Sequence, residues 1–223
     1  MRDVLGFNRF LAGGGDWGSL VSAELGHAHP EHVAGVHLTL PIFPGIDPRT
    51  VVRTDFDENE GWMIERIEQA RPVSISHIEA HRQSAQTLAY AFEDSPAGLA
   101  AWLWERRCNW SDPETISRSL DPHFLCTTAS IYWFTRSIGS SMRLYAAQVD
   151  AGWPLLHDCR PTIAVPTGFA VAPKELFMIP RRLAEERTRL ERWTLLPRGG
   201  HFLPVEAPEL LIEEYRAFAR PLR

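Results

Sequence analysis

The hydrophobic pattern divides the chain into a middle segment and two ends of a different character. Near both ends, short apolar runs alternate with amphipathic stretches, which is typical of strands followed by helices. Between residues 44 and 154, apolar residues recur at helical spacing among charges, and no strand alternation is evident. The pattern therefore predicts an α/β core formed by residues 1–43 and 155–223, with a helical insertion at 44–154.

The amino-terminal end is predicted to form a parallel pair of strands. Apolar residues 10–12 lead into a glycine-rich turn, and residues 33–38 have the composition of a buried strand. A helix is expected between them, from Ser19 to about His27. Residues 2–9 are typical of the end of a helix. A strand, a helix and a second strand in this order imply a parallel arrangement with a crossover connection.

The rest of the chain is predicted to be helical at first and then mixed again. Within the insertion, we expect helices at 61–71, 96–109 and 127–147. Pro96 suits the first position of the second of these helices. In the carboxyl-terminal end, we expect strands at 162–166 and 193–196, a charged helix at 180–190 and a closing amphipathic helix at 207–219.

Composition and charge narrow the class of protein. The chain has 223 residues and a formal net charge of -5, so it lacks the basic surface that nucleic acids and anionic membranes attract. No apolar run is long enough to span a bilayer, and the first residues lack the features of a signal peptide. The three cysteines are odd in number and lack the spacing of metal ligands, so neither a disulfide framework nor a zinc site is expected. We therefore expect a cytoplasmic protein that acts on a small neutral molecule.

One carboxylate is distinctive because it lies in the turn after the first predicted strand. Asp16 has a glycine two residues before it and another two residues after it, and helix-forming residues follow. A side chain held on a sharp strand-to-helix turn needs small neighbours, because the backbone there is strained and a Cβ would collide with the adjoining elements. Gly14 and Gly18 meet this requirement. The alternative is a glycine-rich loop in which Asp16 caps the helix.

Two further side chains follow predicted strands in an informative order. Glu175 follows the strand at 162–166, and His201 follows the strand at 193–196. Nucleophile, acid and histidine in this order are typical of the α/β-hydrolase sheet, whose loops converge at the carboxyl ends of the strands. An ionised aspartate attacks carbon without a base, which suits displacement at an epoxide or a carbon–halogen bond. In such chemistry His201 would activate the water that hydrolyses the Asp16 ester, and Glu175 would orient the imidazole.

A family resemblance is carried by six segments: GGDWGS, HPEHVAGVHL, EDSPAGLAAW, YWFTRSIGSSMRLY, VPTGFAVAPKE and RGGHF. Together they resemble the microsomal-type epoxide hydrolases, including their bacterial relatives, over nearly the whole chain. The resemblance implies an α/β-hydrolase core with a helical cap, and cofactor-free hydrolysis of small apolar epoxides by water to vicinal diols. By position, it implies that Asp16 is the nucleophile, Glu175 the acid and His201 the base. It also implies that Tyr145 is one of two cap tyrosines that hydrogen-bond the epoxide oxygen, where a phenol can supply the proton that the opening ring needs.

The segment SISHIEAHR departs from the family pattern. The other cap tyrosine of the family falls at His77, which can still donate a hydrogen bond to the epoxide oxygen. Tyr132 or Tyr90 is an alternative donor. This segment is therefore expected either to have diverged for another substrate or to have lost its constraint.

The amino-terminal part of the family has no counterpart in the chain, which we therefore expect to be truncated. A His-Gly-x-Pro-type loop that lends one N–H to the oxyanion hole is missing with it, so the N–H of Trp17 is the expected remaining donor. Two other functions stay open. Asp16 followed by Trp17 also suits a haloalkane dehalogenase, and the missing strands together with His77 are compatible with an inactive remnant or a binding module. The sequence leaves the oligomeric state open.

Overall fold

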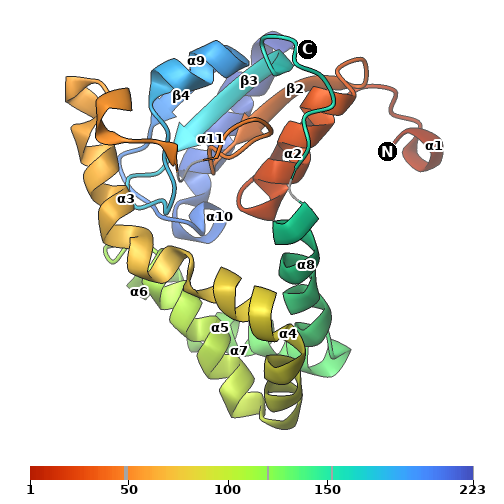
Figure 1. Cartoon of the computed structure of the whole chain (residues 1–223), viewed down its shortest axis with the longest axis vertical. Coiled ribbons are helices and arrows are strands. Elements are labelled where there is room, and N and C mark those ends of the chain that lie inside the picture. The colour runs from red at the N-terminus through yellow and green to blue at the C-terminus, as the bar shows by residue number, and fades with distance from the viewer. Residues whose placement is uncertain (48–49, 120, 152, 223) are drawn as a thin grey trace.

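A parallel sheet of four strands lies at the centre of the structure (Figure 1). The computed structural model describes residues 1–47, 50–119, 121–151 and 153–222. Neighbouring strands in the sheet follow one another along the chain: β1 (Phe10–Gly14), β2 (Val33–Leu38), β3 (Ile163–Val171) and β4 (Thr188–Leu195). All three strand pairs are parallel, so the loops after the strands leave the sheet at the same edge.

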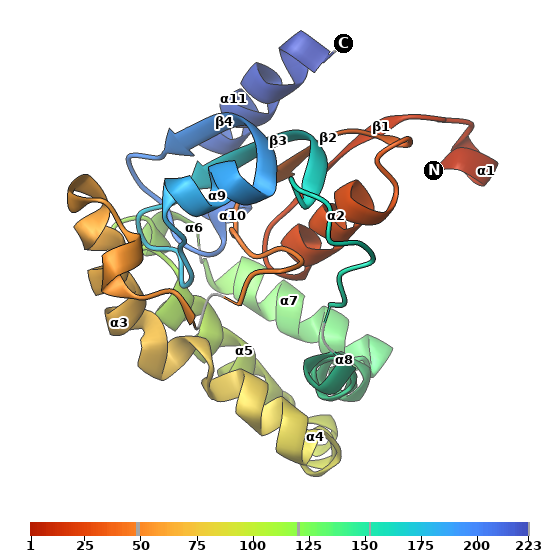
Figure 2. The same cartoon turned by 45° about the horizontal axis from the view of Figure 1, so that its top comes forward.

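Helices cover both faces of the sheet (Figure 2). The helices that cover it are α2 (Trp17–Ala28), α9 (Arg181–Arg187), α10 (Leu203–Glu206) and α11 (Pro208–Ala219), and a short 3-10 turn follows at Arg220–Leu222. The first helix, α1 (Arg2–Leu5), lies apart from the sheet, with Val4 and Leu5 exposed.

Two glycines allow helices to approach the sheet closely from opposite sides. A Cβ added to Gly26 of α2 would come within 2.6 Å of the side chain of Val36. A Cβ added to the neighbouring strand residue Gly35 would instead meet the ring of Phe218 of α11 at 3.0 Å. Because consecutive residues of a strand point to opposite faces, α2 and α11 lie on different sides of the sheet.

The larger apolar core lies on the α2 side of the sheet. Val36 and Phe169 of the strands are buried there with Met178 and Ile179, which precede α9, and with Ala184 of α9. A smaller cluster joins β3 to α10 and α11 on the other side. Burial on both faces explains why the two inner strands, β2 and β3, read as apolar runs in the sequence.

A layer of helices lies beyond the carboxyl ends of the strands (Figure 1). Its members are α3 (Gly61–Ser74), α4 (Ser76–Asp94), α5 (Pro96–Trp110), α6 (Ile116–Ser119), α7 (Pro122–Thr135) and α8 (Ile138–Ala151), preceded by 3-10 turns at Arg53–Asp55 and Glu58–Glu60. Within this helical layer, α4 packs against α8 and α5 packs against α7. As predicted, Pro96 begins α5, and the Ser95 hydroxyl accepts the N–H of Gly98 at 3.0 Å.

The prediction of a single helix over 127–147 is wrong, because the structure has two helices there, α7 and α8. Arg136 ends α7 in the left-handed conformation, with φ of 50°, and its N–H donates to the carbonyl of Trp133. The apolar spacing continues into α8, which is why the sequence pattern does not reveal the break.

Three predicted boundaries in and around β3 and β4 are also wrong. The strand expected at 162–166 continues to Val171, because the register shifts beside Pro166 and this irregularity accommodates the missing N–H. The charged helix expected at 180–190 ends at Arg187 instead. The chain from Thr188 onward pairs with β3, so β4 begins earlier than expected.

Candidate active site

The turn between β1 and α2 holds Asp16 in a strained conformation. Its φ of 50° and ψ of -129° lie in a region that residues with a Cβ rarely adopt. The turn is crowded, since a Cβ added to Gly14 would lie 2.6 Å from the carbonyl carbon of Gly18. A Cβ on Gly18 would meet nothing within 4 Å. The prediction that the turn needs a small residue is therefore confirmed at Gly14 and wrong at Gly18. The Asp16 side chain makes no capping hydrogen bond, so the helix-cap alternative is wrong.

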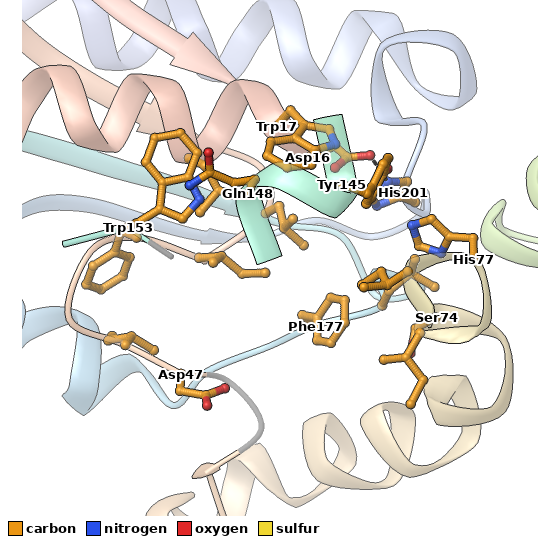
Figure 3. Close-up of a pocket in the computed structure, with 18 of the residues that line it drawn as sticks. Asp16, Trp17, Asp47, Ser74, His77, Tyr145, Gln148, Trp153, Phe177 and His201 are labelled. Carbon is orange, nitrogen blue, oxygen red and sulfur yellow. Dashed lines mark hydrogen bonds and ion pairs between the residues drawn. The ribbon is translucent and has the colours of Figure 1, made fainter. Parts of the chain in front are cut away.

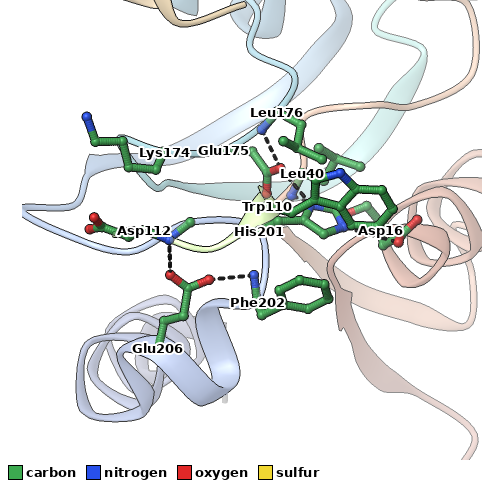
Figure 4. A network of polar contacts seen from close by, with 12 residues as sticks. Asp16, Leu40, Trp110, Asp112, Lys174, Glu175, Leu176, His201, Phe202 and Glu206 are labelled. Atoms are coloured by element: carbon green, nitrogen blue, oxygen red, sulfur yellow. Dashed lines mark hydrogen bonds and ion pairs between the residues drawn. The ribbon is translucent and has the colours of Figure 1, made fainter. Parts of the chain in front are cut away.

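Asp16, His201 and Glu175 are joined by hydrogen bonds (Figure 4). His201 Nε2 lies 3.1 Å from Asp16 Oδ2, and His201 Nδ1 lies 2.7 Å from Glu175 Oε1. Glu175 and His201 are buried, whereas the Asp16 side chain keeps 47% of its surface accessible. The same Glu175 oxygen accepts the N–H of Leu176 at 2.7 Å. The three side chains selected from the sequence thus meet at the carboxyl edge of the sheet.

The loops that carry Glu175 and His201 run side by side. The N–H of Lys174 donates to the carbonyl of Gly199 at 3.0 Å. From α3, the guanidinium of Arg66 donates to the carbonyl oxygens of Lys174 and Glu175 at 2.6 and 3.1 Å. These bonds connect the Glu175 loop to the His201 loop on one side and to the helical layer on the other.

The two carboxylates stabilise a protonated imidazole between them. Burial by itself lowers the pKa of His201, but the charge of Glu175 and the hydrogen bonds to Asp16 and Glu175 outweigh it and raise the pKa to about 10. Burial by itself raises the pKa of Asp16, but the hydrogen bond and charge of His201 more than offset it, so the pKa is lowered. At neutral pH, an ionised Asp16 therefore faces a protonated His201.

A cavity of about 430 Å³ opens onto Asp16 (Figure 3). Asp16, His201, His77 and Tyr145 gather at one end of it, and Asp47 lies at the other. Much of the wall between them is apolar and includes Leu20, Ile42, Phe43, Ile78, Leu176 and Phe177. Such a cavity, with a few polar groups at one end, is the usual form of a small-molecule site.

Tyr145 and His77 reach the cavity from two helices of the helical layer. The ring of Tyr145, on α8, packs edge-on against Trp17 with centroids 5.0 Å apart, and His77, on α4, packs edge-on against Tyr145 at 5.1 Å. Burial and then the charge of Asp16 raise the pKa of Tyr145, so the phenol is protonated. Burial lowers the pKa of His77 to about 4, so its imidazole is neutral at pH 7. Both side chains are therefore uncharged hydrogen-bond donors.

The two alternative tyrosines do not reach the cavity. Tyr90 lies on α4 with 69% of its surface exposed. Tyr132 packs in a separate apolar cluster with Leu99, Ile138 and Met142. Neither residue lines the cavity, so both alternatives to His77 are wrong.

Trp110 completes this end of the cavity, and no sequence motif identifies it. Its ring centroid lies 5.4 Å from that of His201 and 4.6 Å from that of His77. Its carbonyl accepts the N–H of His201 at 3.0 Å, and its indole N–H donates to the carbonyl of Val73 at 3.2 Å. The only signal in the sequence is the abundance of tryptophan, 8 residues in all.

Within the part of the chain that the structure describes, no group of three or more His, Cys, Asp or Glu side chains is arranged to hold a metal ion. Among the described helices, none is both long and apolar enough to cross a membrane.

The order of the candidate site residues along the sheet is typical of one class of protein. A strained carboxylate turn after β1, an acid after β3 and a histidine after β4 are features of an α/β-hydrolase. The epoxide hydrolase of Aspergillus niger has a similar structure, with a TM-score of 0.80 and 25% sequence identity, over 100% of this chain and 55% of the other. The chain therefore has the α/β-hydrolase fold, as its sequence predicts.

Comparison with known sequences narrows the class to one family. No family model matches the chain. It is 32% identical over 221 residues to a protein of Stigmatella aurantiaca that is provisionally named an epoxide hydrolase, covering 98% of this chain and 48% of the relative. It is 30% identical over 236 residues to epoxide hydrolase 1 of Oryctolagus cuniculus, covering 96% of this chain and 51% of the relative. The chain belongs to the epoxide hydrolase family, and it spans about half the length of the curated relatives that it matches.

Proposed function

We propose that this chain carries the catalytic site of an epoxide hydrolase, which converts a small apolar epoxide and water to a vicinal diol through an ester of Asp16. The observation that carries the proposal is the hydrogen-bonded series of Asp16, His201 and Glu175 at one end of an apolar cavity that Tyr145 also lines. In this proposal, residues 44–154 act as a cap over the sheet.

In the first step, a carboxylate oxygen of Asp16 attacks one carbon of the epoxide ring. The bond from that carbon to the ring oxygen breaks, and its electron pair goes to the oxygen. Because Asp16 is ionised at neutral pH, the attack needs no base. Tyr145 donates its proton to the oxygen, and His77 donates a second hydrogen bond to it. The raised pKa of Tyr145 keeps the proton on the phenol until the more basic alkoxide develops.

In the second step, water attacks the carbonyl carbon of the ester while His201 takes one of its protons. To act as a base, His201 must first lose its proton. Ester formation favours this loss, because it removes the charge of Asp16, which helps to raise the pKa of His201. The proton that His201 gives up returns through solvent to the Tyr145 phenolate. General-base assistance of this kind accelerates a step by about 10²–10⁴-fold.

Collapse of the tetrahedral intermediate expels the diol oxygen, which takes a proton from His201. The remaining proton of the water returns to His201 as Asp16 regains its charge. Glu175 keeps the imidazole oriented and offsets its positive charge in the meantime. The cycle thus consumes one epoxide and one water and restores the ion pair.

The N–H of Trp17 is proposed as one donor of the oxyanion hole. Trp17 is the first residue of α2, so its N–H has no acceptor within the helix. The amino-terminal end of a helix also favours nearby negative charge. Both properties suit the oxygen that becomes negative when water attacks the Asp16 ester.

The experiment that tests this function is turnover of a styrene-type epoxide by the purified protein. Diol should form above background, and Asp16→Ala should abolish it. A single turnover in oxygen-labelled water should place the label in Asp16 and not in the first diol released. Label that appears directly in that diol would exclude the ester.

Two other outcomes of the same experiment favour the alternative functions. Halide release from a haloalkane without diol formation would favour a dehalogenase, for which Trp17 beside Asp16 provides an indole at the cavity wall. A folded protein that forms neither product would favour an inactive relative or a binding module.

A further inference from the structure

The loop that carries His201 is held through each of its backbone N–H groups from residue 199 to residue 202. Figure 4 shows the bonds of Glu206 to Phe202 and Asp112. The acceptors lie on Glu206, on Trp110 at the end of α5, and on Asp112 just after it. The bonds run from Gly199 N to Asp112 Oδ2 at 2.9 Å, from Gly200 N to Glu206 Oε2 at 2.9 Å, from His201 N to the carbonyl of Trp110 at 3.0 Å, and from Phe202 N to Glu206 Oε1 at 2.8 Å. Pairing of every donor fixes the backbone that aims the imidazole.

Glu206 bonds both to the His201 loop and to segment 110–115. Besides its two bonds to the His201 loop, its Oε2 accepts the N–H of Asp112 at 2.6 Å and the hydroxyl of Thr115 at 3.0 Å. Glu206 is only 7% exposed and does not line the cavity. Any influence of Glu206 on the reaction must therefore pass through the groups that it holds.

The two segments touch closely because residue 200 is a glycine. A Cβ added to Gly200 would lie 2.7 Å from the N of Asp112 and 2.8 Å from the carbonyl oxygen of Trp110. The approach brings the ring of Trp110 edge-on against that of His201. The helical layer and the His201 loop thus form one hydrogen-bonded unit centred on Glu206.

We propose that Glu206 is a positioning residue, which holds the His201 loop against segment 110–115 so that the imidazole stays between Asp16 and Glu175. A buried carboxylate with four donors can also stabilise a fold without affecting chemistry. Its bonds to Gly200 and Phe202, one on each side of His201, favour a role in positioning the imidazole. The expected effect on catalysis rests on the proposed function, in which His201 activates water.

The first test measures the imidazole without any turnover. Glu206→Ala removes both bonds to the loop, whereas Glu206→Gln keeps the size of the side chain but leaves one acceptor oxygen. We expect the pKa of His201, followed by nuclear magnetic resonance of its ring, to fall in E206A toward the ordinary histidine value of about 6.5. E206Q should lie between E206A and the wild type.

A matched control is available close by. Glu209 is 54% exposed and pairs with Arg198 at the surface. Glu209→Ala therefore removes a carboxylate from the same part of the chain but removes no acceptor from the N–H groups of residues 199–202. In E209A, the pKa of His201 and both rates of the reaction should equal those of the wild type.

The second test separates the two chemical steps by rapid quenching and mass spectrometry of the protein. E206A should slow hydrolysis of the Asp16 ester by about 10–100-fold, because the base is misplaced. Ester formation should change by less than about threefold, so the ester should accumulate. A merely structural role would instead reduce both rates in proportion to the folded fraction.

The outcomes are distinct. An unchanged His201 pKa in folded E206A, or equal slowing of both steps, would overturn the inference. If E206A does not fold, E206Q decides by the same two measurements, because its amide nitrogen cannot accept an N–H from the loop. Wild-type protein that forms no diol would refute the proposed function, while the resonance comparison would still decide whether Glu206 positions His201.

Discussion

Asp16 Oδ2 lies 3.1 Å from Nε2 of His201, on the side of the imidazole opposite to Glu175. The imidazole is therefore held between two carboxylates, of which only Asp16 opens onto the cavity. In the proposed mechanism, ester formation on Asp16 would remove one of these two charges. The protonation of His201 is thus coupled to whether Asp16 is free or esterified.

This coupling predicts that Asp16→Asn lowers the pKa of His201 below its wild-type value of about 10. Asparagine keeps the shape of the side chain but removes the negative charge that favours the imidazolium. The measurement is a titration of the His201 ring signals. Asp47→Asn, at the other end of the cavity, is the matched control and should leave the titration unchanged (Figure 3).

The same ion pair predicts how stability depends on pH. The pKa of His201 is higher in the folded protein, about 10, than in the unfolded chain, about 6.5. Its protonation therefore adds stability that is complete below about pH 6.5 and is lost as the pH rises toward 10. Urea unfolding of the wild type and of His201→Gln should show this loss in the wild type only. A parallel decline in both proteins would contradict the prediction.

Tyr145→Phe is expected to slow ester formation by about 10²–10⁴-fold, because the alkoxide loses its proton donor. Hydrolysis of an ester already formed should keep its rate, so no ester should accumulate. Tyr132→Phe is the control, since Tyr132 lies in a separate cluster away from the cavity. If His77 also donates to the oxygen, His77→Phe should slow the same step further in the Tyr145→Phe background.

The strained turn predicts opposite effects for two glycines that are four residues apart. Gly14→Ala should destabilise the protein by about 1–3 kcal/mol, because its Cβ would collide with the backbone at Gly18. Gly18→Ala meets nothing within 4 Å and lies in α2, so it should stabilise by up to about 1 kcal/mol. Urea midpoints measure both, and a loss of stability in both variants would contradict this account.

The sequence alone predicts the features that depend on neighbouring residues. The turn around Asp16, the start of α5 at Pro96 and the alternation of strands and helices in the core are set by glycine, proline and hydrophobic spacing over a few positions. It also places Glu175 and His201 directly after strands. Because parallel strands end at one edge of the sheet, this placement predicts that the two side chains lie close together. The family resemblance adds Tyr145, which the structure brings to the same cavity.

Other features arise only when distant segments meet. The extension of β3 beyond Pro166 and the early start of β4 at Thr188 depend on the register of adjacent strands, which no local pattern encodes. Trp110 and Glu206 carry no motif, and each reaches His201 through contacts made in the folded chain. The sequence by itself thus determined that Asp16, Glu175 and His201 form the candidate site. The distances between them and their protonation were decided by the tertiary structure, because burial and charge act through space rather than along the chain.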